Sequence, residues 1–81
     1  MGTSLITNEI RKLRFLQGEM TQQDLADRTG VTRQTIVAIE NGKYFPTLEL
    51  AFRIAHVFAC RVEDVFTFIP GAEPDQKNPK K

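Results

Sequence analysis

Two closely spaced helix starts, separated by a turn glycine, constrain the fold of this chain more than any other feature. Thr21 and Asp24 form a T-x-x-D pattern, in which hydroxyl and carboxylate can satisfy the free amides of a first helical turn. Thr32 repeats the capping position, and Gly30 lies between the two helices. Glycine tolerates the left-handed backbone that a sharp turn after a helix requires. The pattern predicts two short capped helices joined by a tight turn, the second closed by Asn41-Gly42.

The apolar residues around this turn suit two helices that cross closely. Leu25 and Ala26 would face inward from the first helix, and Ala26 must be small if the second helix passes near it. Val31 would fill the corner, while Ile36 and Ile39 would anchor the second helix to the core. An isolated helical pair would need apolar residues, but not this combination of small residue, turn glycine and corner residue.

Three more helices are expected around this pair. Residues 7–17 predict a first helix, ended by Gly18, with one apolar stripe made of Ile6, Ile10, Leu13 and Leu16. A fourth helix should begin at Pro46-Thr47, with its inner face carrying Leu50, Ala51, Ile54, Ala55 and Phe58. A short fifth helix is expected around residues 62–65. Ala59 is a poor residue for ending the fourth helix, and Arg61 is a poor cap for the fifth. We therefore expect the junction between these two helices to fray or tighten into a 3₁₀ turn.

The length of 81 residues fits a single domain, which we place at residues 5–69. Residues 70–81 carry three of the four prolines and no large apolar side chain, so they are predicted to be disordered, as are residues 1–4. A domain this small has modest stability, a deficit that a partner subunit often makes up.

Composition excludes several classes of protein. The one cysteine, Cys60, cannot form an internal disulfide and fits a reducing compartment. No apolar run has the length of a signal peptide or a membrane span, so we expect a cytoplasmic protein without a membrane partner. The net charge of only +1 means that any case for nucleic-acid binding depends on where the charges lie.

The residues also give little support for catalysis. We expect no enzyme activity, cofactor, metal or small-molecule substrate, because no catalytic set has a recognisable spacing. His56 and Cys60 lie four apart, but two ligands do not complete a zinc site. We interpret Cys60 as a small buried hydrophobic residue in preference to a redox sensor, and His56 as a surface residue.

From about residue 8 to residue 66 the chain resembles the lambda-repressor/Cro-like helix-turn-helix family, also called the Xre family. The resemblance lies in IRKLR, TQQDLADRTGVTRQTI, IENGKYFPTLE and RVEDVF. It implies an all-α, compact five-helix DNA-binding domain whose third helix, residues 32–41, enters the major groove. It also implies a cytoplasmic, prokaryotic or phage-type regulator that binds a two-fold symmetric operator on double-stranded DNA as a homodimer, most simply as a repressor. Ala59 and Arg61 depart from the family pattern, which affects the last helix junction and not the DNA-reading part.

Helical spacing supports the expected readout. Ile36, Ile39 and Glu40 would cluster on one side of the third helix, away from its outer residues. The expected base contacts are Arg33, Gln34, Val37 and Ala38. Arg can bind guanine, Gln can bind adenine, and Val or Ala can touch a thymine methyl group. The alternative is that these side chains are ordinary solvated surface.

Phosphate contacts are expected at helix N-termini and in the loop after the third helix. They are Gln22, Thr32, Thr35, Asn41, Lys43, Tyr44 and Arg11. Tyr44 is equally suited to packing.

Two further groups have structural roles. The resemblance implies that Arg14 and Glu40 form an ion pair linking the first helix to the end of the third. The expected dimer contact is made by Phe66, Phe68 and Ile69. One form that this contact can take is a short extended strand that pairs with the same strand of a second subunit. For Phe66 alone, packing on the first helix is the alternative.

The rival function is a protein-interaction module, such as an antitoxin-like subunit that masks a partner.

Overall fold

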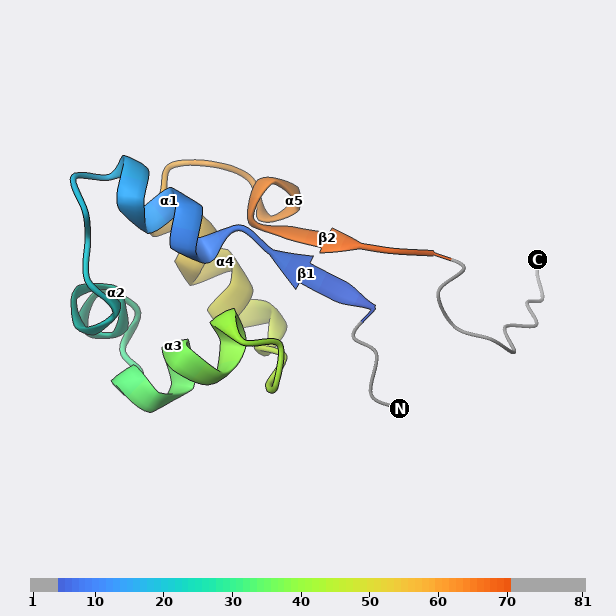
Figure 1. The fold of residues 1–81 in the computed structure, drawn as a ribbon, viewed down its shortest axis with the longest axis horizontal. Coiled ribbons are helices and arrows are strands. Elements are labelled where there is room, and N and C mark those ends of the chain that lie inside the picture. Colours follow the sequence, from blue (N-terminus) through green and yellow to red (C-terminus); the bar gives the residue numbers. More distant parts are fainter. Residues whose placement is uncertain (1–4, 71–81) are drawn as a thin grey trace.

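The computed structural model describes residues 5–70, so the expectations for residues 1–4 and 71–81 lie outside the described residues. The elements run β1 (Ile6–Asn8), α1 (Ile10–Leu16), α2 (Gln22–Thr29), α3 (Arg33–Glu40), α4 (Leu48–Val57), α5 (Val62–Val65) and β2 (Phe66–Phe68) (Figure 1). The expected helical architecture is confirmed, with two short strands added to it.

The capping residues form the bonds that their sequence pattern predicts. Thr21 Oγ1 accepts a hydrogen bond from the Asp24 amide at 2.9 Å, and Asp24 Oδ2 accepts one from the Thr21 amide at 3.3 Å. Gly30 ends α2 with φ +80°, and Thr32 Oγ1 accepts from the Thr35 amide at 3.2 Å. The α2–turn–α3 unit is therefore set by local chemistry.

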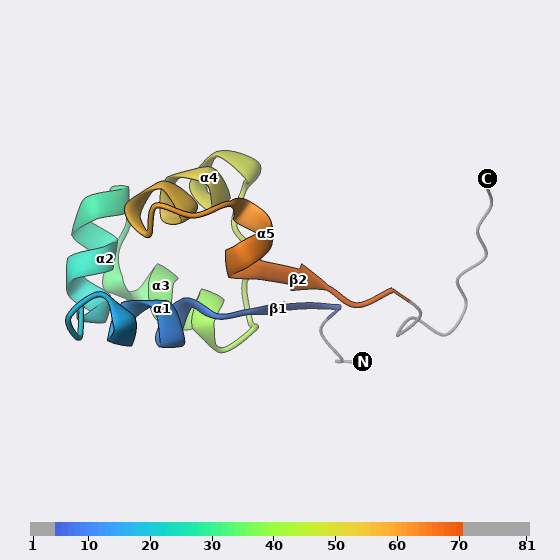
Figure 2. The same cartoon turned by 90° about the horizontal axis from the view of Figure 1, so that it is seen from above.

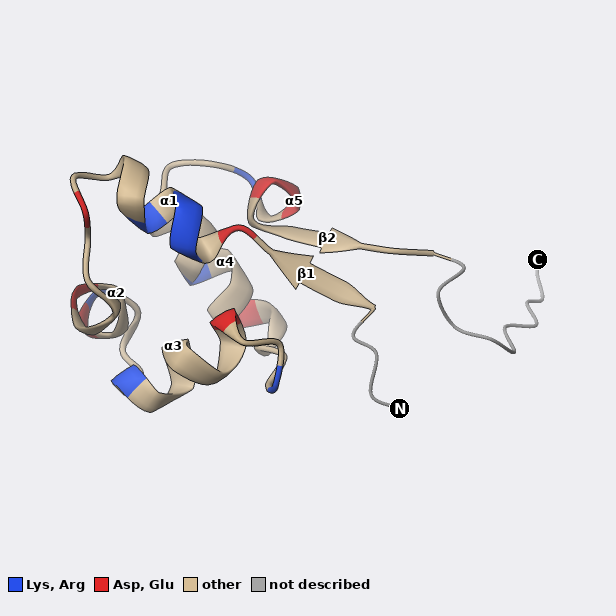
Figure 3. Ribbon diagram, in the orientation of Figure 1, with Lys and Arg blue, Asp and Glu red and all other residues tan. Residues whose placement is uncertain are grey.

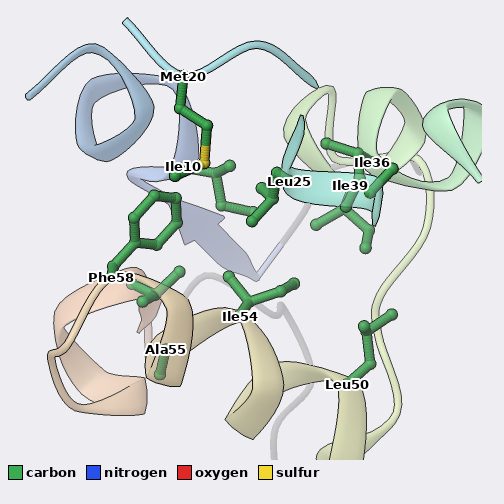
Figure 4. Packing of buried hydrophobic residues seen from close by; sticks show 11 residues of the cluster. Ile10, Met20, Leu25, Ile36, Ile39, Leu50, Ile54, Ala55 and Phe58 are labelled. Carbon is green, nitrogen blue, oxygen red and sulfur yellow. The ribbon is translucent and has the colours of Figure 1, made fainter. Parts of the chain in front are cut away.

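The core lies where α1, α2, α3 and α4 meet (Figure 4). Figure 4 labels Ile10, Met20, Leu25, Ile36, Ile39, Leu50, Ile54, Ala55 and Phe58, all of which are buried. Ala26 is fully buried in α2, a helix that packs against both α3 and α4. Leu16, the last residue of the expected apolar stripe, is 67% exposed and lies outside this core.

The first helix starts later than residue 7, which corrects our prediction. Residues Ile6–Asn8 form a strand that pairs antiparallel with Phe66–Phe68, as Figure 2 shows from above. Asn8 then ends the strand and starts the helix: its Oδ1 accepts from the Ile10 amide at 3.1 Å. Its Nδ2 donates to the Ile39 carbonyl at 3.0 Å, which ties the start of α1 to α3.

The junction between α4 and α5 is an ordered turn, and the 3₁₀-type tightening expected there is limited to one hydrogen bond between residues three apart. The Cys60 amide donates to the Ala55 carbonyl at 3.1 Å, and the Ala59 amide to the His56 carbonyl at 3.0 Å. These two bonds form a Schellman motif, which requires a left-handed residue. Ala59 supplies it with φ +55°. Arg61 gives no side-chain cap, and Asp64 Oδ2 accepts from the Arg61 amide instead, at 3.0 Å.

Replacing Ala59 by glycine should raise the free energy of unfolding by about 0.5–1 kcal/mol. Glycine removes the left-handed strain of about 1–2 kcal/mol, partly offset by the greater freedom of glycine in the unfolded chain. Urea denaturation measures the change. Ala38→Gly is the control, because a glycine inside helix α3 should lower stability by about 0.5–1 kcal/mol. Two destabilised variants would contradict the assignment of strain to Ala59.

Candidate nucleic-acid interface

The outer face of α3 carries a shallow hollow. It is lined by Arg33, Gln34, Val37, Ala38, Asn41 and Lys43. Arg33 and Gln34 are exposed and Val37 and Ala38 half-buried, whereas Ile36 and Ile39 are buried on the opposite side of the helix. The structure thus brings the four residues expected to contact bases onto one open surface.

The loop after α3 places a lysine at the end of this hollow. The Gly42 amide donates to the Ile39 carbonyl at 3.0 Å, and the Lys43 amide to the Ala38 carbonyl at 2.9 Å. These bonds fold the chain back over the helix end, and Gly42 adopts the required φ of +74°. The side chains of Asn41 and Lys43, both exposed, therefore stay close to the α3 face.

A second hollow lies along the other edge of α3, between α1 and α2. Arg33 and Asn41 line both hollows, and Arg11 and Gln22 join them in the second. Three of the expected phosphate contacts, Arg11, Gln22 and Asn41, thus lie together.

Thr35 and Tyr44 are not part of either hollow. They line a third one, between α3 and α4, together with Val31 and Leu50. The Tyr44 side chain is 44% exposed, so part of its ring is covered. These two residues therefore flank the outer face of α3 on the side of α4, away from Arg11 and Gln22.

Charges are distributed unevenly over these elements. Figure 3 shows basic residues on α1, at the start of α3 and in the loop after it, while α2 and α5 carry acidic residues. The described residues lining the α3 hollow include Arg33 and Lys43 but no carboxylate. A net charge of +1 for the whole chain therefore conceals a locally positive surface.

Glu40, at the C-terminal end of α3, is neutralised by an ion pair. Arg14 Nε lies 2.7 Å from Glu40 Oε2, Arg14 Nη2 donates to Glu40 Oε1 at 3.2 Å, and Arg14 Nη1 donates to the Met20 carbonyl at 2.8 Å. The side chains of Arg14 and Glu40 are only 15% and 8% exposed, respectively. The pair joins α1, α3 and the loop before α2.

Gln22 and Thr32, both expected at phosphates, already have partners within the protein. Gln22 Nε2 donates to Glu40 Oε1 at 3.2 Å, and Gln22 Oε1 accepts from Arg33 Nη2 at 3.4 Å. The hydroxyls of Thr32 and Thr35 lie 3.0 Å apart. The two links of Gln22 were not predicted from the sequence, since its partners are 18 and 11 residues away and no local pattern reveals them.

The predicted dimer contact has two different parts. Phe66 is half-buried and packs against the core, while Phe68 and Ile69 are 61% and 40% exposed. Strand β2 is extended as expected, but it pairs with β1 of the same chain. The Ile69 amide continues this ladder by donating to the Leu5 carbonyl at 2.8 Å.

The remaining candidate residues lie away from α3. Cys60 is half-buried at the edge of the core, less than we expected, and burial, followed by the charge of Asp64, raises the pKa of its thiol. His56 is exposed and lines the same hollow beside α4 as Cys60. Within residues 5–70, no three His, Cys, Asp or Glu side chains group in a way that could hold a metal ion. No helix in this described region combines the length and apolar character needed to cross a membrane.

The amino-acid sequence of this chain is similar to those of known proteins. The family model described as helix-turn-helix matches residues 10–65, the segment from α1 to α5. The chain is 51% identical over 61 residues to the uncharacterized HTH-type transcriptional regulator MJ0272 of Methanocaldococcus jannaschii, covering 75% of this chain and 91% of that protein. An uncharacterized HTH-type transcriptional regulator of Archaeoglobus fulgidus is 54% identical over 59 residues, which cover 73% of this chain and 83% of that protein. The uncharacterized HTH-type transcriptional regulator YgzD of Bacillus subtilis is 46% identical over 59 residues, which cover 73% of this chain and 88% of that protein.

Proposed function

Because this chain belongs to the helix-turn-helix family, we propose that it binds double-stranded DNA sequence-specifically and acts as a small transcriptional regulator. The observation that carries the proposal is the open hollow of α3, which gathers Arg33, Gln34, Val37 and Ala38 together with Asn41 and Lys43 from the end of the helix. Helix α3 would lie in the major groove. Repression is the simplest action, because occupying a site excludes other proteins from it. The relatives come from archaea and a bacterium, and we place the activity in the cytoplasm.

The chemistry of the hollow suits base edges. The Arg33 guanidinium matches the O6 and N7 acceptors of guanine, and the Gln34 amide matches N6 and N7 of adenine. Val37 and Ala38 offer an apolar surface for a thymine methyl group. Polar groups at the start of the helix and apolar ones in its middle would therefore read neighbouring base pairs.

Phosphate contacts would surround this centre. Lys43 and Arg11 supply positive charge, and Asn41 supplies an amide donor between them. At Gln22 and Thr32 the backbone amides at the helix starts are better suited to phosphate than the side chains, which already have partners. Thr35 and Tyr44 would meet the DNA backbone where it passes the α3–α4 loop.

Selection from a random duplex library tests the proposal. We expect enrichment of a sequence with two-fold symmetry, whose half-sites are centred about 10–10.5 base pairs apart or a multiple of that spacing. Affinity for this selected duplex should fall steeply as salt concentration rises, since phosphate contacts release counterions. Failure to enrich any sequence, together with no affinity for any duplex at low salt, would refute DNA binding.

We propose that a homodimer forms through the outer end of β2, with Phe68 and Ile69 against a second copy and Phe66 supporting the strand from the core. Phe68→Asp should stay folded, because its side chain is 61% exposed, and should sediment as a monomer where wild type sediments as a dimer. Phe52→Asp is the control, since Phe52 is 57% exposed on α4. A folded Phe68→Asp variant that sediments like wild type would reject this contact.

A protein-interaction role is the second candidate, and one surface favours it. Leu48 and Phe52 are 70% and 57% exposed on the outer side of α4. Two large apolar side chains exposed on one helix are typical of a surface that contacts another protein. A partner protein could cover them, as in an antitoxin-like complex. Stable co-purification of one second polypeptide, abolished by Phe52→Asp, would support this role over an independent regulator.

A further inference from the structure

A hollow between α2, α4 and α5 lies apart from the face of α3 that is proposed to bind DNA. Figure 2 shows α4 on the opposite side of the domain from α1. No residue that lines this hollow also lines the hollow on α3. We call it the α4–α5 hollow. Its lining includes the apolar residues Phe52, Cys60 and Val62 and the basic residues Arg28, Arg53 and Arg61.

The composition of the α4–α5 hollow is that of a contact surface. Cys60 and Val62 are half-buried and pack against the core, while Phe52 is 57% exposed. Aromatic residues and arginine are enriched at protein–protein interfaces, where lysine is depleted. The lining contains three arginines and no lysine. An exposed aromatic ring beside arginines is therefore a candidate anchor for another protein.

Arg53 is already fixed in the wall of this hollow. Its Nη1 donates to the Thr29 carbonyl at 3.1 Å, and its Nη2 donates to Glu49 Oε2 at 2.6 Å. A guanidinium has five N–H donors, so these two bonds leave others for a partner. The side chain is 54% exposed, and a partner can therefore reach it. Because the side chain is ordered in advance, a bond to it removes little further conformational entropy.

The charges around the hollow do not cancel. Glu49 pairs with Arg53, and Glu63 lies 4.0 Å from Arg61, with both side chains of the second pair exposed. Arg28, in the last turn of α2, has no hydrogen bond or ion pair through its side chain within residues 5–70. Exposed ion pairs contribute little stability, so a partner carboxylate can compete with Glu63 for Arg61. The lining thus offers two cationic positions to an acidic partner.

The shape of the surroundings selects a helix as the docked segment. The residues that line the hollow come from α2, α4, α5 and the loop before α5, and none from the two described strands. An extended peptide would find no strand edge here to pair with. A helix satisfies its own backbone groups, and its apolar face can lie in a groove between other helices.

We propose that the α4–α5 hollow docks an acidic amphipathic helix carried by a partner protein. The apolar face of that helix covers Phe52, and carboxylates on its flanks pair with Arg28 and Arg61. This rests on the protein-interaction role proposed for α4 and is independent of DNA binding. Because the two hollows share no residue, the partner and a duplex occupy the protein at the same time.

Selection from a random-peptide library on the whole folded protein tests the chemistry of the partner. We expect enriched peptides with apolar residues at i, i+4 and i+7 and with Asp or Glu beside them. A synthetic copy of an enriched peptide should bind Phe52→Asp about tenfold or more weakly than wild type, and Arg28→Glu about fivefold more weakly. Its affinity should also fall as salt concentration rises.

Two exposed residues of α1 supply matched controls. Phe15→Asp makes the same change at an aromatic side chain that is 66% exposed, and Lys12→Glu alters the charge as Arg28→Glu does. Both variants should bind the peptide like wild type. The Cys60 thiol gives a second readout, because it lines the hollow. At one peptide concentration, bound peptide should slow its labelling by a thiol reagent in wild type but not in Phe52→Asp.

Several results would overturn the proposal. Enrichment of basic peptides, or of none, would reject an acidic partner, and peptides that bind Phe52→Asp like wild type would place the site elsewhere. Oligomers of wild type that Phe52→Asp dissociates and Phe68→Asp does not would mean that a second copy covers the hollow. Thermal unfolding of each variant shows whether weaker binding comes from a smaller fraction of folded protein.

The outcomes also separate this proposal from the functions proposed above. Absence of duplex binding alone overturns the DNA-binding function and leaves the peptide results unaffected. A partner that co-purifies only when Phe52 is intact, without enrichment of acidic peptides, keeps the interaction role and rejects the acidic helix. The synthetic peptide should bind the complex with the selected duplex as tightly as the free protein. Mutual exclusion of peptide and duplex would contradict simultaneous occupancy.

Discussion

Removing the carboxylate of Glu40 should lower the free energy of unfolding by about 3–5 kcal/mol, because it leaves the Arg14 guanidinium buried without its partner. The Arg14 side chain is only 15% exposed, so water cannot fully replace the two carboxylate oxygens. Small domains have a total stability of about 5–15 kcal/mol, so Glu40→Ala should unfold at a much lower urea concentration.

The control is a second Glu–Arg pair that lies on the surface. Glu49 and Arg53 are 2.6 Å apart, but their side chains are 74% and 54% exposed. Glu49→Ala should cost at most about 1 kcal/mol. The double replacement Arg14→Met with Glu40→Leu should be clearly more stable than Glu40→Ala, since no unpaired charge is left. Equal destabilisation by Glu40→Ala and Glu49→Ala would mean that burial of the pair has no energetic importance.

Arg33→Ala and Lys43→Ala should weaken DNA binding in two different ways. Removing a bidentate base contact at Arg33 should cost about 1–3 kcal/mol on the selected duplex and relax preference at one base pair per half-site. Gln34→Ala should do the same at a neighbouring base pair. Lys43→Ala should weaken all duplexes alike and reduce the salt slope by about one unit for each phosphate that is no longer neutralised.

Titrations of selected and scrambled duplexes at several salt concentrations measure both effects. Arg61→Ala is the control for charge alone, because Arg61 is 76% exposed at the start of α5, away from α3. If Arg33→Ala and Lys43→Ala reduce affinity equally on both duplexes, Arg33 does not read a base. If neither changes binding, the DNA-binding face lies elsewhere.

The helices were predictable where their ends are set by local chemistry. Thr21 with Asp24, Thr32 and Gly30 have partners within a few residues, so their pattern can be read directly from the sequence. Helix α5 also spans the expected residues, Val62–Val65. It does so although Ala59 and Arg61 are unfavourable residues for the junction that precedes it. The Schellman bonds at Ala59 form because they satisfy free carbonyls, despite the unfavourable residue.

Features that depend on distant partners could not be predicted in this way. Residues 7 and 8 suit a helix by spacing, but Ile6–Asn8 pairs with Phe66–Phe68 from the other end of the domain. The same pairing explains why α1 starts only at Ile10. At the candidate site, the residue types of α3 were enough to select its outer face, whereas the contacts of Gln22 with Arg33 and Glu40 depend on how α2 packs against α3.

The pairing of β1 with β2 also sets the order in which the domain can be completed during synthesis. Ile6–Asn8 leaves the ribosome first among the described elements, and its partner Phe66–Phe68 leaves last. At about 5–20 residues per second, the edge of β1 waits for roughly 3–12 s before its partner is available. Until then the Glu9 amide also lacks the Val65 carbonyl that it later contacts at 2.8 Å. A nascent chain halted before residue 66 would therefore carry the complete helical pair α2–α3 on a scaffold whose first segment is still unpaired.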